Sequence, residues 1–299
     1  MRVFRFGVVA AFARGGDDWA DKARRAESLG YATLVIPDGL RHSLAPLPAM
    51  AMAAAATRSL RVGTYVLAND LRHPVLVAKD VATLDLLSGG RVELGIGAGR
   101  PGAAEDVRML GRAFDPGSVR VARLAESLSL LKSLLAGQPA TPDGPHYAFE
   151  RAEVSPRPLQ QPRPPIMVAG SGRRLLELAA READIVALGV APEAPEDAVA
   201  EKIGWLRHAA GSAERLDQLE LNLNLMAVGQ QVPRYISTQL GLQAEDLART
   251  GAVSALVGTP DEMCATLLRR RERLGISYVV VSDELMEALA PVVERLAGR

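Results

Sequence analysis

The chain has 299 residues, 48% of them hydrophobic and 23% charged, as expected for a globular protein with a large core. Its 35 basic and 35 acidic side chains balance, which argues against nucleic acid or an anionic membrane surface as a partner. The single cysteine, Cys264, excludes an intrachain disulfide and a cysteine-only metal site, and it fits a reducing compartment.

The first residues resemble a very short targeting segment. Residues 1–13 carry two arginines, then an apolar run that ends in Ala11, Phe12 and Ala13. This segment is shorter than the roughly 15 residues that a signal peptide needs, and no apolar run reaches the ~18 residues of a membrane span. We therefore expect a cytoplasmic protein that does not enter a membrane.

Short β-rich runs alternate with longer amphipathic stretches in the first third of the chain. Gly30 stands where a helix commonly ends, and Pro74 stands where a helix commonly begins. The predicted strands are residues 4–10, 32–37, 60–67 and 91–96. The predicted helices are residues 17–29, 47–57 and 74–87.

After Gly97 the alternation is interrupted and then resumes. A helix is predicted at about residues 118–135, and the polar, proline-rich stretch 137–164 contains a possible hairpin strand at 147–154. The further predicted strands are residues 165–169, 185–188, 218–228 and 277–281. The further predicted helices are residues 173–182, 196–210, 233–240, 244–250, 260–274 and 284–296.

Eight strands, each followed by helix, predict an α/β fold of the (β/α)8 TIM-barrel type. No proline- or glycine-rich linker separates two self-sufficient halves, so we expect one domain over residues 1–299 with elaborated loops. An open, doubly wound parallel sheet is the alternative architecture.

In a parallel barrel the chemistry lies at the carboxyl ends of the strands, where the loops converge. The sequence places Asp38 after the second strand, Ala68 at the end of the third, and Gly97–Arg100 after the fourth. After the fifth strand comes Gly170–Gly172. These positions are the candidate functional residues.

Residues 97–102, GAGRPG, form a GxGxxG string after a strand, which suggests dinucleotide binding. Such a motif normally opens a helix within a compact βαβ unit, whereas here Pro101 interrupts the turn and the next predicted strand is near residue 165. We favour a loop whose backbone passes close to a flat ring system, because side chains would obstruct that approach. A plain flexible loop is the alternative.

Residues 165–174, PIMVAGSGRR, run from a buried strand through a Gly-Ser-Gly turn into a helix. The free N–H groups at the helix start, with Ser171, Arg173 and Arg174, predict an anion site suited to a cofactor phosphate. An ordinary turn with exposed arginines explains the local sequence equally well.

The sequence offers little support for metal or hydrolytic chemistry. The four histidines show no ligand spacing, so no metal site is expected, and no nucleophile elbow is present. The histidines are His42, His73, His146 and His208. Phe6, Trp19, Val62 and Val92 are expected in the core.

Taken together, these segments resemble the luciferase-like class of flavin and deazaflavin oxidoreductases over nearly the whole chain. Residues 30–40, GYATLVIPDGL, resemble the class's "GF/Y…PDHL" strand. Residues 60–74, LRVGTYVLANDLRHP, and 78–99, AKDVATLDLLSGGRVELGIGAG, resemble its most specific stretch and come close to a deazaflavin-dependent subgroup. Residues 165–184 resemble the segment that holds the tail phosphate, and residues 256–262 resemble the entry to the last helices.

The resemblance implies a coenzyme F420 site, with FMN as the alternative cofactor, and a homodimer. By that resemblance Asp38 hydrogen-bonds the ring, and Tyr65-Val66 forms a non-prolyl cis peptide that backs it. The other implied cofactor contacts are Ala68, Ala98, Gly99, Ala169, Gly170, Ser171 and Gly172.

Two departures from the class pattern bear on the substrate. Gly39 stands where the class usually has histidine, and Arg100 stands where it often has an aromatic residue or, in sugar-phosphate dehydrogenases, an acid. We therefore expect no sugar-phosphate oxidation, and we assign Arg100 with Asp38 to the catalytic site. Arg100 can orient an anionic substrate or stabilise developing negative charge, although a solvated loop arginine is an equally simple interpretation.

The leading hypothesis is hydride transfer between F420 and a small organic substrate, with reduction of a C=C or C=N bond. The first alternative is an FMN-dependent monooxygenase. The second, suggested by Gly39, is a barrel that binds cofactor without catalysing a reaction.

Overall fold

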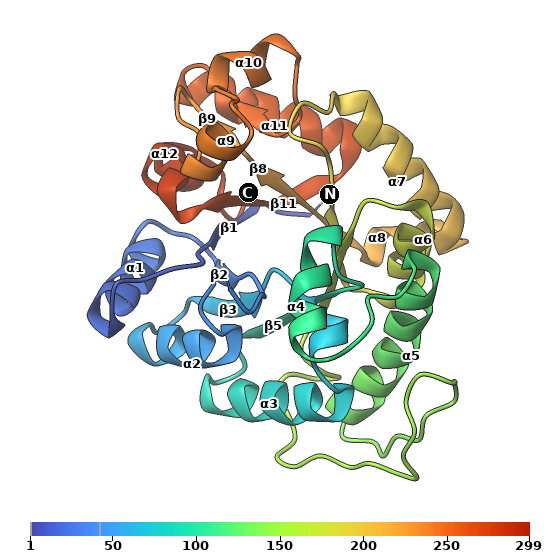
Figure 1. Ribbon diagram of the computed structural model, residues 1–299. Coiled ribbons are helices and arrows are strands. Elements are labelled where there is room, and N and C mark those ends of the chain that lie inside the picture. The colour runs from blue at the N-terminus through green and yellow to red at the C-terminus, as the bar shows by residue number, and fades with distance from the viewer. Residues whose placement is uncertain (1, 42) are drawn as a thin grey trace.

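The computed structural model describes residues 2–41 and 43–299, which form a closed barrel of eight parallel strand positions ringed by helices (Figure 1). Going round from β2, the order is β1, β11, β8, β7, β6 and β5, and β3 closes the ring by pairing with both β5 and β2. β4 also pairs with β5, so β3 and β4 are two parts of one barrel strand. This closure excludes the open sheet. The barrel strands are β1 (Arg5–Val9), β2 (Thr33–Ile36), β3 (Arg61–Thr64), β4 (Leu67–Ala68), β5 (Val92–Gly97), β6 (Ile166–Gly170), β7 (Ile185–Leu188), β8 (Glu220–Leu225) and β11 (Ile276–Ser282).

The helices follow the strands in chain order and cover the outside of the barrel (Figure 1). Four have the predicted bounds: α3 (Pro74–Leu87), α6 (Arg173–Glu182), α7 (Glu196–Ala210) and α11 (Pro260–Leu274). The others are α1 (Gly16–Ser28), α2 (Pro46–Ala56), α4 (Ala104–Met109), α5 (Gly117–Leu135), α8 (Ala213–Gln218), α9 (Arg234–Gln239), α10 (Ala244–Arg249) and α12 (Met286–Leu296). Short 3-10 helices are η1 (Asn69–Leu71), η2 (Pro101–Ala103) and η3 (Asp283–Leu285).

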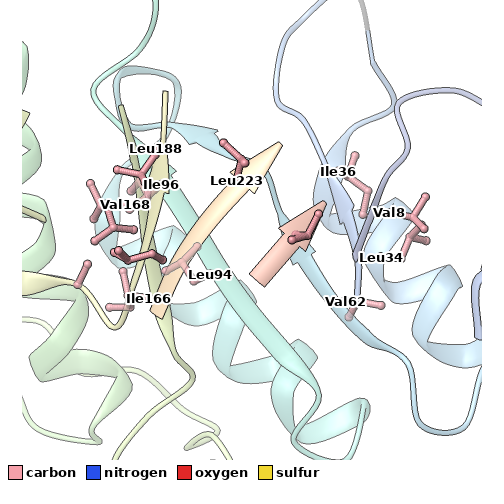
Figure 2. Packing of buried hydrophobic residues seen from close by; sticks show 14 of the residues in the cluster. Val8, Leu34, Ile36, Val62, Leu94, Ile96, Ile166, Val168, Leu188 and Leu223 are labelled. Atoms are coloured by element: carbon pink, nitrogen blue, oxygen red, sulfur yellow. The ribbon is translucent and has the colours of Figure 1, made fainter. Parts of the chain in front are cut away.

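The strands bury both faces, as parallel strands between helices must. One face packs against the helices and supplies the main core, to which the predicted core residues Phe6, Trp19, Val62 and Val92 all belong. Figure 2 shows other members of that cluster on the strands, among them Val8, Leu34, Ile96 and Val168. The other face fills the barrel interior with Met167, Ile185, Ala187, Tyr278 and Val280.

The bottom of the barrel, at the amino ends of the strands, is filled by two buried glutamates and two half-buried arginines. Arg5 donates to both carboxylate oxygens of Glu220, at 2.7 and 2.6 Å, and to Glu93 at 2.5 Å. Arg61 donates to the same Glu93 oxygen at 2.6 Å. The guanidinium of Arg5 also lies 3.7 Å from the ring centre of Tyr278. This network closes the end of the barrel opposite the candidate site.

Two strand predictions were wrong. Residues 147–154 form no strand among the described residues; the segment makes one isolated β-bridge, between Ala140 and Ala152. The predicted strand 218–228 is divided, because residue Met226 turns its backbone N–H to the carbonyl of Ser254. The part beyond it, β9 (Ala227–Val228), leaves the barrel and pairs with β10 (Ala255–Leu256).

None of the helices formed by residues 2–41 and 43–299 has both the length and the apolar character needed to cross a membrane. The same residues contain no cluster of three or more histidine, cysteine, aspartate or glutamate side chains suited to a metal. His42 lies outside the described residues.

Candidate functional site

Asp38 follows β2 at the carboxyl end of the barrel, and only one of its carboxylate oxygens is engaged. Its side chain is 1% exposed, and Oδ2 accepts from the Ala68 N–H at 3.0 Å and from the Arg72 guanidinium. Oδ1 is buried without a partner among the described residues. The structure thus joins the predicted residues Asp38 and Ala68 and adds Arg72, which the sequence did not single out. The free oxygen fits a ligand that offers an N–H or O–H donor.

The Tyr65-Val66 peptide is cis, as predicted. It lies between β3 and β4, where the Thr64 hydroxyl donates to the Gly95 carbonyl at 2.6 Å and accepts from the Gly95 N–H at 2.9 Å. A Cβ on Gly95 would lie 2.0 Å from the Thr64 carbonyl oxygen, so only glycine allows this approach. The bulge therefore depends on the neighbouring strand as well as on its own sequence.

Tyr65 itself is fixed inside the barrel. Its hydroxyl donates to Oδ1 of Asn222 at 2.8 Å, and burial raises the pKa of that hydroxyl, which keeps it protonated. Nδ2 of Asn222 and Oδ1 of Asn224 are both buried without a partner in the described part of the chain. Asn222 and Asn224 are two residues apart on β8, so they share one strand face. Neither asparagine was predicted from the sequence.

Three predicted segments meet at the end of β5. A Cβ placed on Gly97 would lie 3.1 Å from a methyl group of Val66 and 3.3 Å from the carbonyl oxygen of Ala169. Val66, Gly97 and Ala169 are therefore neighbours at the ends of their strands. Because Gly97 has no side chain, nothing projects from the chain at this point.

The glycine-rich loop after β5 is anchored rather than loose. Ala98 is buried, and Gly99 has φ of +80°, a conformation that favours glycine. The buried Arg120 of α5 donates to the carbonyls of Ala98, at 2.5 Å, and Gly99. Its guanidinium lies 4.1 Å from the ring centre of Phe114. Arg120, which the sequence did not single out, thus ties the start of this loop to α5.

Arg100 lies at the rim of the barrel, on the loop that Arg120 anchors. Its side chain is exposed and folds over Gly102, with Nη1 3.6 Å from the point that a Cβ there would occupy. Within the described residues it takes part in no ion pair. Its charge is therefore available to a ligand at the mouth.

The Gly-Ser-Gly turn joins β6 to α6. A Cβ on Gly170 would lie 2.2 Å from the Leu175 side chain, which would have to move, and the Gly170 carbonyl accepts from the Gly189 N–H at 2.8 Å. α6 begins without a side-chain cap, and the space around the Cα of Gly172 is open. Its first N–H groups are therefore available to an anion.

The structure adds one cation to the two predicted around this turn. Arg173 is exposed and pairs with Glu177 of its own helix at 2.8 Å, while Arg174 is exposed. Lys202 of α7 donates to the Ser171 carbonyl at 2.6 Å. Lys202 thus joins the turn from a different helix, a contact that no local sequence pattern indicates.

The carboxyl ends of the parallel strands form one end of the closed barrel, which we call the mouth. Each of the predicted residues Asp38, Arg100 and Ser171 follows the carboxyl end of a strand, so all three lie at the mouth, as predicted. A cavity of about 410 Å³ adjoins this mouth on the η1 side. A second cavity of about 290 Å³ is lined by the charged residues at the bottom of the barrel, including Arg5, Glu93 and Glu220. Only the first is close to the candidate site.

Comparison with known sequences identifies the group of proteins to which the chain is similar. The family model described as luciferase-like monooxygenase matches residues 4–232. An F420-dependent glucose-6-phosphate dehydrogenase of Nakamurella multipartita is 34% identical over 228 residues, covering 72% of this chain and 65% of the relative. Another of the same name, from Beutenbergia cavernae, is 36% identical over 167 residues, covering 53% and 48%. The chain therefore spans about half to two thirds of the length of these curated relatives.

Solved structures show the same fold over nearly the full chain. The F420-dependent tetrahydromethanopterin reductase of Methanopyrus kandleri has a TM-score of 0.78 at 18% identity, covering 99% of this chain and 100% of its own. An F420-dependent secondary alcohol dehydrogenase, solved with an F420–acetone adduct, has a TM-score of 0.76 at 19% identity, covering 97% and 99%. At these identities the likeness concerns the fold.

Proposed function

This chain belongs to the luciferase-like monooxygenase family, and we propose that it is an oxidoreductase that transfers hydride between coenzyme F420 and a small organic substrate. The named F420 dependence of its curated relatives supports the cofactor. The observation that carries the proposal is the half-engaged Asp38 beside the Tyr65-Val66 bulge, at the same mouth as an uncapped helix start.

The residues at the mouth suit a tricyclic ring with a phosphate-bearing chain. Oδ1 of Asp38 would accept from the ring, while Val66, Ala98 and Gly99 would lie along it. The turn Gly170–Gly172 and the first N–H groups of α6 would hold the phosphate. The deazaflavin supplies the hydride when bound, and the protein supplies position and electrostatics.

We assign Arg100 to the reacting end of the substrate. It lies at the rim without a carboxylate partner among the described residues, so it can stabilise negative charge that develops when a C=C or C=N bond accepts hydride. Arg100 occupies the position where sugar-phosphate dehydrogenases carry an acid, so the protein is not expected to oxidise glucose 6-phosphate. The proposal also includes one catalytic domain over residues 1–299, a homodimer and a cytoplasmic location.

A direct test is hydride transfer by the purified protein. Reduced F420 is mixed with a panel of activated alkenes and imines, and its oxidation is followed by the return of deazaflavin absorbance. The proposal expects turnover with at least one panel member and none when oxidised F420 is offered glucose 6-phosphate. Tight F420 binding with no turnover across the panel would favour a barrel that binds cofactor without catalysis.

The name of the matching family model favours a second candidate, an FMN-dependent monooxygenase. The two candidates differ in their reaction with oxygen, because reduced flavin readily forms an oxygen adduct. Aerobic spectra of the protein with reduced FMN would show such an adduct in the monooxygenase and none in the F420 enzyme.

A further inference from the structure

The cavity of about 410 Å³ beside the mouth, which we call the arginine pocket, is within the size range of small-molecule sites. Two of its residues connect it to the candidate cofactor site. Arg72 lines the pocket and donates to Asp38, and Asn69 directly follows Ala68. A ligand in the pocket would therefore lie next to the proposed ring site. The lining residues are Asn69, Asp70, Arg72, His73, Val107, Arg112, Ala113, Asp115, Arg123, His146 and Tyr147.

Three guanidinium groups reach this pocket from different segments, and two of them are neutralised. Arg123 of α5 donates to Asp70 at 2.7 Å and also to Asp115. Arg72 is paired with Asp38. Arg112 differs, since it donates only to the main-chain carbonyl of Asp70, at 2.9 Å, and pairs with no carboxylate among the described residues.

His73 does not supply a second free cation at neutral pH. Burial and the nearby charge of Arg112 both lower the pKa of its imidazole. Its Nδ1 accepts from the Val75 N–H at 3.3 Å, a contact that requires that nitrogen to be unprotonated. Arg112 is therefore the one arginine of the three without a carboxylate partner among the described residues, although Asp38, Asp70 and Asp115 equal the three arginines in number.

The rest of the wall is apolar in part. Val107 is fully buried at the pocket, and Ala113 and the ring of Tyr147 add further nonpolar surface. The Tyr147 hydroxyl accepts from Asn69 at 3.0 Å, so it is already engaged. Such a site suits a ligand with one charged end and a short nonpolar body.

We infer that the arginine pocket binds the carboxylate of an organic acid, with Arg112 as its anchor. A guanidinium matches a carboxylate with two parallel hydrogen bonds, and the N–H groups of Arg112 that do not reach the Asp70 carbonyl are available to form them. The inference rests on the proposed function in one respect, because it assigns this acid to the substrate of the neighbouring F420 site.

The test compares benzoate with its neutral analogue benzamide by calorimetric titration of the full chain. We expect benzoate to bind at least about tenfold more tightly, and Arg112→Gln to abolish that preference. The matched control is Arg108→Gln, which changes an exposed arginine of α4 that, within the described part of the chain, donates only to Ala104 of its own helix. Equal binding of the two probes, equal effects of the two variants, or tighter binding of inorganic phosphate would overturn the carboxylate site.

A second measurement separates this inference from the proposed function. F420 titration should give the same affinity in wild type and in Arg112→Gln, while oxidation of reduced F420 by crotonate, compared with crotonamide, should lose its preference for the acid in the variant. Arg112-dependent benzoate binding without any F420 binding would overturn the proposed function alone. If the wild type oxidises reduced F420 equally fast with crotonate and with crotonamide, the pocket does not bind the acid group of the substrate.

Discussion

At the scale of single residues, the candidate site is defined by polar atoms that the fold leaves without partners. Among the described residues, Asp38 uses one oxygen for Ala68 and Arg72 and leaves the other free, and Asn222 and Asn224 each leave one amide atom free. Buried atoms without a partner also occur elsewhere, for example in Glu93 and Tyr278, so the free Asp38 oxygen supports a ligand site through its place at the carboxyl ends of the strands.

Arg100 is the residue whose role is most readily separated from cofactor binding. We expect Arg100→Ala to lower turnover at least about tenfold while changing F420 affinity little, since the lost interaction belongs to the reacting substrate. Initial rates and F420 titration of the same preparation measure the two effects, with Arg108→Ala as the control. Equal losses of turnover and affinity would instead assign Arg100 to the cofactor.

The sequence predicted the site residues that belong to strand ends and glycine turns, but not the side chains that support them. Asn222 and Asn224 alternate with leucines in β8, a pattern typical of a strand with one solvated face, whereas the barrel interior buries that face. Arg120 and Lys202 are ordinary helix residues until the tertiary fold brings them to a loop carbonyl. Such contacts join distant segments and leave no local pattern.

At the scale of elements, prediction succeeded where a boundary has a local cause. α3 and α11 each begin at proline, and α11 ends before Gly275, which has φ of +72°. Prediction failed where a distant residue sets the boundary of an element. At Met226 the backbone N–H donates to the Ser254 carbonyl, and β8 ends there. The six-residue helices α4 and α8 were missed, although α9 and α10 of the same length were predicted.

The start of α6 provides an element-scale test of the phosphate site. Gly172 has φ −81° and ψ 144°, and no atom lies within 4 Å of a Cβ added there, so Gly172→Asp fits and can cap the helix. We expect unchanged or slightly higher stability, but F420 affinity at least about tenfold lower, because the carboxylate takes the free N–H groups and repels the phosphate.

The matched variant Gly172→Asn provides the same cap without the charge and should weaken F420 binding less. Thermal unfolding and F420 titration of both variants measure the two effects. Wild-type F420 affinity in Gly172→Asp would show that the start of α6 does not hold the phosphate.

At the scale of the whole molecule, the residues expected to stabilise the fold and those expected to bind ligand lie at opposite ends of the barrel. The ion pairs among Arg5, Arg61, Glu93 and Glu220 lie at the bottom, whereas the free oxygen of Asp38 and the uncapped start of α6 lie at the mouth. This separation agrees with the general division of such barrels, in which function lies at the carboxyl ends of the strands.

Glu93 is the centre of the bottom network, and its removal tests the structural role of that end. Glu93→Gln leaves Arg5 and Arg61 without their shared carboxylate, so we expect the free energy of unfolding to fall by about 3–5 kcal/mol. Urea unfolding measures the loss, with the exposed Glu201→Gln as control. A loss below about 1 kcal/mol would mean that the pairing contributes no more than a surface ion pair.

The same comparison has a defined pH dependence. Burial alone would raise the pKa of Glu93, but Arg5 and Arg61 outweigh it and the pKa is lowered. The stabilisation by the charged carboxylate is therefore complete above the ordinary glutamate range, near pH 4.3, and is lost as pH falls toward the lowered pKa. The difference between wild type and Glu93→Gln should shrink over that interval.

The central claim concerns the cofactor, and calorimetric titration of the protein with F420 and with FMN at two ionic strengths tests it most directly. Both cofactors carry a tricyclic ring and a phosphate, but F420 adds an anionic oligoglutamate tail, which Arg100, Arg174 and Lys202 can attract at the rim. Exposed charge contacts weaken as salt rises. We predict tighter binding of F420 than of FMN, by a margin that narrows as ionic strength increases. Tighter binding of FMN, or a preference for F420 that salt leaves unchanged, would contradict the account.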